Sequence, residues 1–449
     1  MKAASSKYAS PFMSVFRVTG GNFLEMYDFM VFGFYAPWIA KAFFPAKSEM
    51  ASLLLALATF GSGFLMRPLG AIILGGYTDR HGRRAGLLLT LSLMAFGTLS
   101  IACMPGYNKI GVAAPLLVLL GRLLQGLSAG AELGGVSVYL SEIAPQGRKG
   151  FYVSWQSASQ QVAVFVAALL GILLVQHLRP QTMESWGWRI PLWVGCLVIP
   201  FLFWIRTSLT ETEEFIARKQ TMSMSAVLHS VVRNWRIVGI ATLLTTLTTT
   251  AFYLITAYTP TYGANTLHLS RTDALQVTLS VGVCSFILLP VMGALSDRSG
   301  RRPLLWISTL AVLTTAYPAM LWLTAHPSFS RLLAVEIWFA ILYASYNGAM
   351  VVYLTEIMPP DVRTTSFSLA YSTATAVFGG FTPFLCTALI QATGNRAMPA
   401  VWLCFAAFLA LIAIACTYRK QLLVSRSLTP TFSSAPLCTS PPHEMVSSE

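Results

Sequence analysis

Long apolar stretches follow one another along nearly the whole chain, separated by short segments that hold most of the charged residues. A helix of about 20 apolar residues crosses the hydrocarbon core of a bilayer, which is roughly 30 Å thick. The pattern therefore predicts an all-α membrane protein with twelve transmembrane helices. They lie near Val15–Ala40, Leu53–Gly76, Leu87–Met104, Ala113–Leu140, Tyr152–Val175, Ile190–Ile205, Ile237–Tyr258, Leu275–Leu295, Leu304–Thr324, Leu332–Leu354, Phe367–Ile390 and Val401–Cys416.

Composition and charge agree with lipid as the solvent. The chain is 55% hydrophobic and 10% charged, whereas soluble domains carry about 25% charged residues. Its net charge of +13 could suggest nucleic acid, but in membrane proteins the positions of Lys and Arg matter more than their sum. Most of the 30 basic residues fall on one predicted side together with both termini, which predicts that both termini are cytoplasmic. We expect no nucleic-acid partner.

A decapeptide occurs twice, once after the second predicted helix and once after the eighth. Gly75–Arg84 reads GGYTDRHGRR and Gly293–Arg302 reads GALSDRSGRR. Tyr139–Pro145 returns at nearly the same offset as Tyr353–Pro359. Repeats separated by an even number of spans keep the same orientation, so they predict two halves with the substrate between them. The predicted parts are a six-helix bundle (1–205), a cytoplasmic loop (206–236), a second bundle (237–418) and a disordered tail (419–449).

These motifs resemble a known superfamily. The decapeptide G-x-x-x-D-R-x-G-R-R is similar to the signature loop of the major facilitator superfamily. Four further motifs, Asn22–Asp28, Arg67–Ala71, Gly121–Gly126 with Glu132, and Glu211–Phe215, resemble its metabolite:proton symporter family. Two more, Ser154–Gln161 and Tyr258–Gly263, resemble its citrate:proton symporters most, with the tricarballylate carriers near by.

The resemblance implies proton-coupled uptake of a tricarboxylate by alternating access between two six-helix bundles. Another organic acid or a zwitterionic metabolite remains the alternative. It also implies that the two signature loops gate the cytoplasmic side, with both aspartates able to cap the next helix or pair across the halves. The expected gating residues are Gly75, Asp79, Arg80, Gly82, Arg83, Arg84, Gly293, Asp297, Arg298, Gly300, Arg301 and Arg302.

Two acids lie inside the first predicted helix. Glu25 and Asp28 are three residues apart, so they fall about 60° apart on the helix, and Asn22 extends the same polar face. An ionised carboxylate at membrane depth is costly unless it is paired or hydrated. Both acids are therefore candidates for proton coupling, and the alternative is a structural ion pair. Asn22 is a candidate substrate contact.

The fourth helix carries a second polar face. Arg122, Gln125 and Glu132 fall within a sector of about 80°, and roughly 15 Å separates the first from the last. A buried guanidinium matches a carboxylate with two parallel hydrogen bonds, so Arg122 is a candidate substrate anchor or proton relay. It could instead pair permanently with Asp28 or Glu25. For Arg67, substrate contact and a structural pair are equally open, whereas Gln125 is a candidate substrate contact and Glu132 a candidate proton-coupling group.

Neutral polar side chains on the fifth and tenth helices could bind carboxylate or hydroxyl oxygens. The alternative for each is a hydrogen bond between helices, worth about 1 kcal/mol in membranes. These candidates are Gln156, Gln160, Tyr346 and Asn347.

Other function classes lack support in the sequence. It contains no Walker loop, no H-E-x-x-H, no G-x-S-x-G and no credible metal-ligand cluster. We therefore expect a transporter, not an enzyme, that acts as a monomer with no metal and no cofactor besides the co-transported proton. Its partners would be a small organic anion, protons and lipid. A signalling receptor or a membrane enzyme is the less favoured class.

Overall fold

The computed structural model describes residues 11–81, 83–130, 132–207, 233–358 and 363–427, and the elements in these ranges are helices. The predicted all-α fold is confirmed. The N-terminal half contains α1 (Pro11–Phe34), α2 (Ala36–Phe43), α3 (Glu49–Leu65), α4 (Arg67–His81), α5 (Arg83–Cys103), α6 (Tyr107–Ile110), α7 (Ala113–Ala129), α8 (Glu132–Ile143), α9 (Lys149–His177), α10 (Pro180–Ser185), η1 (Gly187–Arg189) and α11 (Ile190–Thr207).

The described part of the C-terminal half is also helical. Three of its segments, η2, η3 and η5, are π-helical. The elements are α14 (Trp235–Tyr253), η2 (Leu254–Tyr258), α15 (Thr259–Thr261), η3 (Tyr262–Thr266), α16 (Arg271–Ser299), α17 (Arg301–Ala325), α18 (Phe329–Ile357), α19 (Arg363–Ala374), η5 (Thr375–Gly379), α20 (Thr382–Thr393) and α21 (Met398–Ser427).

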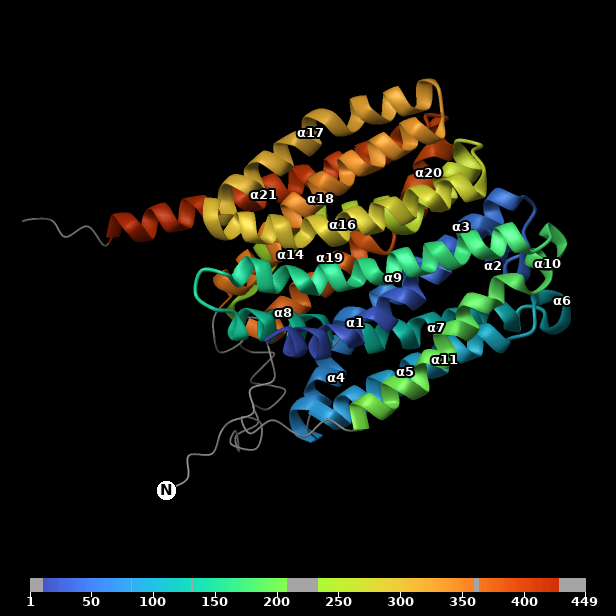
Figure 1. Ribbon diagram of the computed structural model, residues 1–449, viewed down its shortest axis with the longest axis horizontal. Helices are drawn as coiled ribbons and strands as arrows, with labels where there is room; N and C mark the ends of the chain where they lie inside the picture. Colours follow the sequence, from blue (N-terminus) through green and yellow to red (C-terminus); the bar gives the residue numbers. More distant parts are fainter. Residues whose placement is uncertain (1–10, 82, 131, 208–232, 359–362, 428–449) are drawn as a thin grey trace, which may run out of the picture.

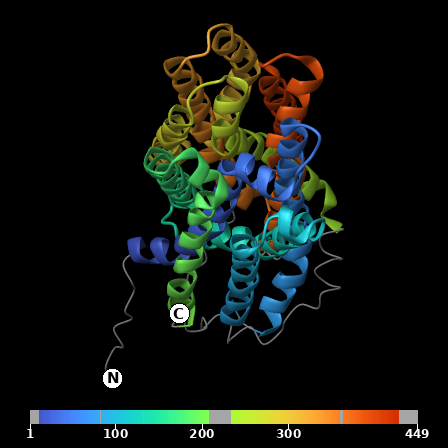
Figure 2. The ribbon, with the colours of Figure 1, turned by 90° about the vertical axis from the view of Figure 1, so that its right-hand side faces the viewer.

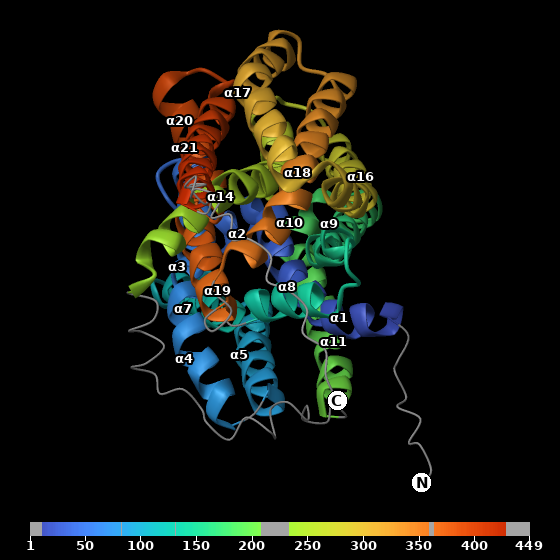
Figure 3. The same ribbon diagram turned by 90° about the vertical axis from the view of Figure 1, so that its left-hand side faces the viewer.

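The helices run side by side along one common direction, as Figure 1 shows. Seen from either end of the molecule, in Figures 2 and 3, the blue-to-green N-terminal half and the yellow-to-red C-terminal half form two groups that meet along one face. Helices α9 and α16 pack against each other where the halves meet, and α1 packs against α9 and η2. The centre of the molecule is therefore lined by both halves.

The outer surface is apolar. Leu197 is 77% exposed, Ile307 67% and Phe96 62%, and contiguous apolar surface of this kind marks contact with membrane or protein. Nine of the described helical segments are long and apolar enough to span a membrane, and Leu88–Cys103 and Gly187–Pro200 are shorter apolar helices. The structure thus agrees with the hydropathy pattern.

Two of the predicted parts lie largely outside the described residues. Of the loop 206–236, residues 208–232 are outside them, and so are residues 428–449 of the tail. The last helix continues to Ser427, so the first part of the segment that we expected to be tail is helical.

The halves contact each other at both ends. We call the end where α16 passes into α17 the signature end, because the second copy of the repeated decapeptide lies there. Thr355 Oγ1 donates to Ser141 Oγ across the halves at 3.3 Å at this end. Toward the opposite end, a Cβ added to Gly33 would lie 3.3 Å from Cβ of Ala257, and one added to Gly171 of α9 would lie 3.1 Å from Cδ1 of Leu275 on α16. This conformation is closed at both ends along these contacts.

Candidate functional site

Four charged side chains form two ion pairs deep inside the N-terminal half. Oε1 of Glu25 lies 3.1 Å from Nη2 of Arg67, and Oδ2 of Asp28 lies 3.4 Å from Nη1 of Arg122. Asp28 is 3% exposed and the other three no more than 1%. An unpaired buried charge is strongly destabilising, whereas a paired one is tolerated. In this conformation each acid therefore neutralises one arginine.

The Asp28–Arg122 pair belongs to a closed hydrogen-bond network. Thr98 Oγ1 donates to Oδ1 of Asp28 at 2.8 Å, and Arg122 Nη1 donates to Oε1 of Gln125 at 2.7 Å. Nε2 of Gln125 donates in turn to Thr98 Oγ1 at 3.0 Å. Gln125 is one helical turn beyond Arg122, so it orients the guanidinium that could meet a substrate.

Aromatic rings enclose both guanidinium groups. Cζ of Arg122 lies 4.5 Å from the centroid of the Phe29 ring and 4.6 Å from that of Phe32. Cζ of Arg67 lies 4.6 Å from the same Phe29 ring and 4.5 Å from that of Phe64. Such cation–π contacts stabilise a desolvated cation by about 2 kcal/mol. Phe29 thus brings two buried positive charges close together.

Part of each guanidinium has no acceptor. Arg67 Nε, Arg122 Nε and Arg122 Nη2 are buried and have no hydrogen-bond partner among the described residues. A buried donor without an acceptor costs about 1–3 kcal/mol, more for a charged group. A carboxylate that entered here would find donors of opposite charge with unused hydrogens.

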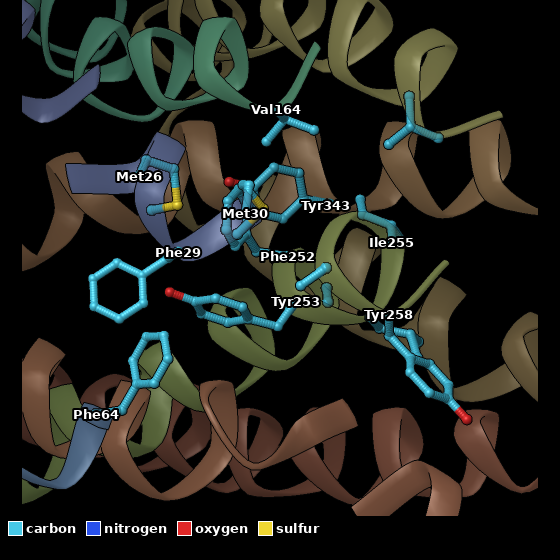
Figure 4. Close-up of a cluster of buried hydrophobic side chains, with 14 of the residues drawn as sticks. Met26, Phe29, Met30, Phe64, Val164, Phe252, Tyr253, Ile255, Tyr258 and Tyr343 are labelled. Atoms are coloured by element: carbon cyan, nitrogen blue, oxygen red, sulfur yellow. The ribbon is translucent and has the colours of Figure 1, made fainter. Parts of the chain in front are cut away.

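The C-terminal half covers this cluster with tyrosines. The Tyr253 hydroxyl lies next to the Arg67 guanidinium, and Figure 4 shows it directed toward Phe29. Tyr371 also lies close to Arg67, and the Tyr343 hydroxyl lies beside Gln161 of α9. The charged cluster of one half therefore faces phenols of the other, at the place where alternating access requires a substrate to bind.

The predicted amides of α9 meet the first helix. Asn22 Nδ2 donates to the backbone oxygen of Gln156 at 3.1 Å, and Gln160 Nε2 donates to Oδ1 of Asn22 at 3.4 Å. Oε1 of Gln156 accepts from Ser157 at 2.8 Å, while its Nε2 has no partner among the described residues. These three candidates are brought together, and Gln156 keeps a donor available for a ligand.

Tyr346 and Asn347 make their hydrogen bonds within the C-terminal half. The Tyr346 hydroxyl donates to the backbone oxygen of Leu244 at 2.7 Å, and Asn347 Nδ2 donates to Thr248 Oγ1 at 2.7 Å. Both bonds join α18 to α14, which is the alternative that the sequence left open. Oδ1 of Asn347 has no partner in the described part of the chain.

Several predicted residues cannot be placed in the site. Gly82 lies outside the described residues, and the structure does not describe the side chains of Glu132, Asp79, Arg80, Arg83 and Arg84, or the surroundings of Gly75. Glu132 begins α8, Gly75, Asp79 and Arg80 lie on α4, and Arg83 and Arg84 begin α5.

The second copy of the repeat joins the halves. Asp297 accepts from the backbone N–H groups of Gly150 at 2.8 Å and Phe151 at 3.0 Å. These are among the first N–H groups of α9, which have no partner inside the helix, and a carboxylate there also meets the positive end of the helix dipole. Asp297 thus caps a helix of the other half, not the next helix along its own chain.

An ion-pair chain holds the capping aspartate in place. Nη1 of Arg301 lies 2.7 Å from Oδ1 of Asp297, and Nη2 of Arg301 lies 3.1 Å from Oε1 of Glu356. Gly300 has φ 86° between α16 and α17, a conformation that favours glycine. Arg298 is exposed and Arg302 is half-buried. Within this copy Asp297 bonds α9 of the other half, and Arg301 pairs with Asp297.

We predict that Gly293→Ala destabilises closure of the signature end. A Cβ at Gly293 would lie 2.5 Å from the carbonyl oxygen of Gly150, so α16 and α9 would have to separate. Overpacking of this kind costs about 1–3 kcal/mol. Labelling of single cysteines introduced near this end should therefore increase about fivefold or more, while transport turnover falls.

Gly239→Ala is the matched control for this substitution. Gly239 is helical, and an added Cβ meets nothing within 4 Å. The control should label and transport as wild type does. Wild-type labelling of Gly293→Ala would contradict a closing role for the glycine contact.

Sequence reasoning missed several residues of the site. Thr98, Phe29 and Tyr253 were not candidates because a threonine or an aromatic residue inside an apolar span reads as ordinary core. Their partners become visible only when helices are packed together. Within the described ranges no group of three or more His, Cys, Asp or Glu side chains is placed to hold a metal ion.

Comparison with known families agrees with this architecture. The family described as the Major Facilitator Superfamily matches residues 18–383. The chain therefore belongs to the major facilitator superfamily, a family of membrane transporters.

Relatives of this chain share most of its length. A citrate-proton symporter from Salmonella typhi is 58% identical over 91% of this chain and 94% of its own. A citrate-proton symporter from Klebsiella pneumoniae is 56% identical over 91% of this chain and 92% of its own. An alpha-ketoglutarate permease from Escherichia coli is 33% identical over 86% and 89%.

Solved structures share the fold. A D-xylose-proton symporter superimposes with a TM-score of 0.73 at 18% identity, covering 90% of this chain and 97% of its own. The partially occluded, inward-open xylose transporter of E. coli superimposes with a TM-score of 0.72 at 17% identity, and the match covers 95% of this chain and 99% of the transporter. This likeness supports the architecture and carries no information about the substrate.

Proposed function

We propose that this chain is a secondary active transporter that takes up citrate, or a closely related tricarboxylate, together with protons by alternating access. The two citrate-proton symporters that are more than half identical over most of both chains support the substrate class. The superfamily supports the transport mode. The rest of the proposal depends on the buried charges.

The observation that carries the proposal is the pair of arginines around Phe29. Arg67 and Arg122 both contact its ring, and both keep buried N–H groups that find no acceptor in the part of the chain that the structure describes. One carboxylate neutralises one guanidinium, whereas a molecule with several carboxylates can bridge two. A polycarboxylate therefore suits this arrangement better than a zwitterion with one carboxylate does.

Asp28 couples the proton to the substrate in this proposal. Asp28 already occupies Arg122, so a substrate carboxylate and ionised Asp28 compete for the same guanidinium. Protonation of Asp28 removes its attraction for Arg122 and leaves the guanidinium free for the substrate. Substrate binding and proton uptake thus favour each other, as reciprocal linkage requires. Glu25 stands in the same relation to Arg67.

The charge carried by citrate makes this coupling necessary. Moving one charge across 100 mV changes the free energy by about 2.3 kcal/mol. A trivalent anion that enters a negative-inside cell alone would move against roughly three times that amount. Protons that enter with it offset the charge and add the energy of the pH gradient.

The signature end faces the cytoplasm in this proposal, because the basic residues gather on that side. The chain is a multi-pass protein of the bacterial inner membrane with both termini inside. The conformation closed at both ends then lies between the outward-open and inward-open states. The transporter acts as a monomer and needs no cofactor besides the co-transported proton.

Uptake of labelled citrate into proteoliposomes tests the proposal. With an imposed pH gradient, acid outside, citrate should accumulate above its external concentration, and without the gradient it should only equilibrate. Unlabelled citrate and tricarballylate should compete more strongly than succinate or betaine. Accumulation that does not depend on the pH gradient would contradict proton coupling. Stronger competition by succinate than by citrate would support the dicarboxylate alternative, which the alpha-ketoglutarate permease relative favours.

A further inference from the structure

The C-terminal half contains a buried acid that the ion pairs above do not use. Glu336 lies on α18 and is 4% exposed. Its Oε1 accepts from Thr259 Oγ1 at 3.1 Å, and its Oε2 has no partner among the described residues. In the part of the chain that the structure describes, no lysine or arginine forms an ion pair with it.

An acid in this position is compatible with the closed structure only in its neutral form. A buried carboxylate without a cation costs several kcal/mol, and membrane depth adds no water to reduce that cost. The other ionisable groups described nearby do not supply a countercharge. Tyr262 lies beside Glu336 and donates to the backbone oxygen of Arg396 at 2.8 Å, Cys386 is buried near Tyr262, and the Arg396 side chain is exposed.

The element that covers Glu336 is built to bend. Thr259 stands between the π-helical segments η2 and η3, and Pro260 follows it. π-Helical turns and a proline both interrupt the regular α-helical hydrogen bonds, and both are common causes of hinges and kinks in helices. A helix with these interruptions can move away from its neighbours at modest cost.

The same element closes the outer end of the molecule. Ala257 of η2 lies against Gly33 of α1, where an added Cβ would be 3.3 Å from Cβ of Ala257. Glu336 is within about 11 Å of the first residue of α18 along the helix axis, and that residue lies at the end opposite the signature end. Bending of η2 to η3 would therefore open the outer end and bring water to Glu336.

We propose that Glu336 is a second proton-binding site, one that exchanges its proton with the outer solution and whose protonation permits the outer end to close. This inference rests on the proposed function for its orientation and its place in the transport cycle. The ionised acid needs water and so favours the outward-open state. The neutral acid fits the closed one. Closure is therefore linked to the binding of one proton.

The position of the outer end can be measured without citrate. In purified protein in nanodiscs, with the native cysteines replaced, spin labels at Lys109 and His326, which are exposed residues of the two halves, report its opening. Between about pH 5.5 and 8.5 the open-to-closed ratio of the wild-type background should rise with pH, by up to about tenfold per pH unit, which is the limit for one proton. Glu336→Gln should be closed at every pH.

Two further variants keep this test decisive. Glu336→Asp retains an acid and should restore the pH response, whereas Glu184→Gln removes an exposed acid near the same end and should leave the response unchanged. An unaltered pH response in Glu336→Gln would overturn the proposal.

Transport provides an independent readout. In proteoliposomes Glu336→Gln should flatten the dependence of citrate uptake on external pH without changing the number of protons that enter per citrate. A changed proton-to-citrate ratio would overturn the proposal that Glu336 exchanges its proton only with the outer solution. The label distances are measured without citrate. The role of Glu336 can therefore still be tested if citrate proves not to be the substrate.

Discussion

Asp28→Asn should abolish proton-driven accumulation of citrate while leaving exchange of internal for external citrate measurable. Asparagine cannot take up a proton or neutralise Arg122, which is completely buried. An uncompensated buried charge costs about 3–5 kcal/mol, so the empty carrier could not pass through the closed conformation. A carrier loaded with citrate could, because the substrate carboxylate would pair with the arginine.

Two assays on the same proteoliposomes separate these steps. Net uptake driven by an imposed pH gradient should fall to the equilibrium level, and counterflow of labelled citrate should persist. Glu184→Gln removes an exposed acid that pairs with Lys41 at the surface, where such pairs contribute at most about 1 kcal/mol, and should accumulate citrate normally. Concentrative uptake by Asp28→Asn at the wild-type level would exclude Asp28 as a coupling group.

Arg122→Gln should reduce citrate affinity more than any change of a neutral residue in the cluster. Truncating one member of a buried charge pair costs about 2–5 kcal/mol, which corresponds to a loss of roughly 30-fold to several thousandfold in binding. Part of that loss could come from Asp28, which the substitution leaves buried without its cation. The single variant therefore cannot separate anchoring from pairing.

The double variant Asp28→Asn with Arg122→Gln separates them. It removes both charges, so melting temperature in detergent without citrate should recover toward wild type. Citrate should nevertheless fail to raise that temperature, because the guanidinium is gone. If the double variant binds citrate as the wild type does, Arg122 serves only to neutralise Asp28. Arg122→Lys keeps the charge without the planar fork and should bind with intermediate affinity.

The arrangement of the acids could be predicted from the sequence, but their partners could not. Helical spacing places Glu25 and Asp28 on one face, and their cost in lipid predicts pairing or protonation. Which arginine meets which acid depends on how α1, α4 and α7 pack. The structure assigns Glu25 to Arg67 and Asp28 to Arg122, and nothing in the spacing along one helix favours that choice.

The contribution of the C-terminal half was the least accessible to sequence reasoning. Tyr346 and Asn347 were candidates because they are polar, yet their hydrogen bonds hold α18 to α14. Tyr253 faces the charged cluster instead, and Tyr343 lies beside Gln161 of α9. All four are polar side chains in apolar spans, so only the packed structure separates those that join helices from those that face the other half.

The contacts of the signature loops could be predicted only in part from the sequence. The repeat indicates where the halves are related, and the resemblance implied a gate with aspartates and arginines. It did not indicate that Asp297 would accept from the backbone N–H groups of Gly150 and Phe151. Backbone groups leave no trace in a sequence motif, so a cap across two halves cannot be predicted from side-chain types.

Proton uptake on citrate binding tests the central claim, that a proton on Asp28 releases Arg122 for the substrate. Purified protein in weakly buffered solution, at a pH where Asp28 is ionised in the empty carrier, is mixed with citrate while the solution pH is recorded. Wild type should take up protons in proportion to the citrate bound, and Asp28→Asn should take up about one proton fewer per citrate. Equal proton uptake by the two proteins, at equal citrate occupancy, would contradict the account.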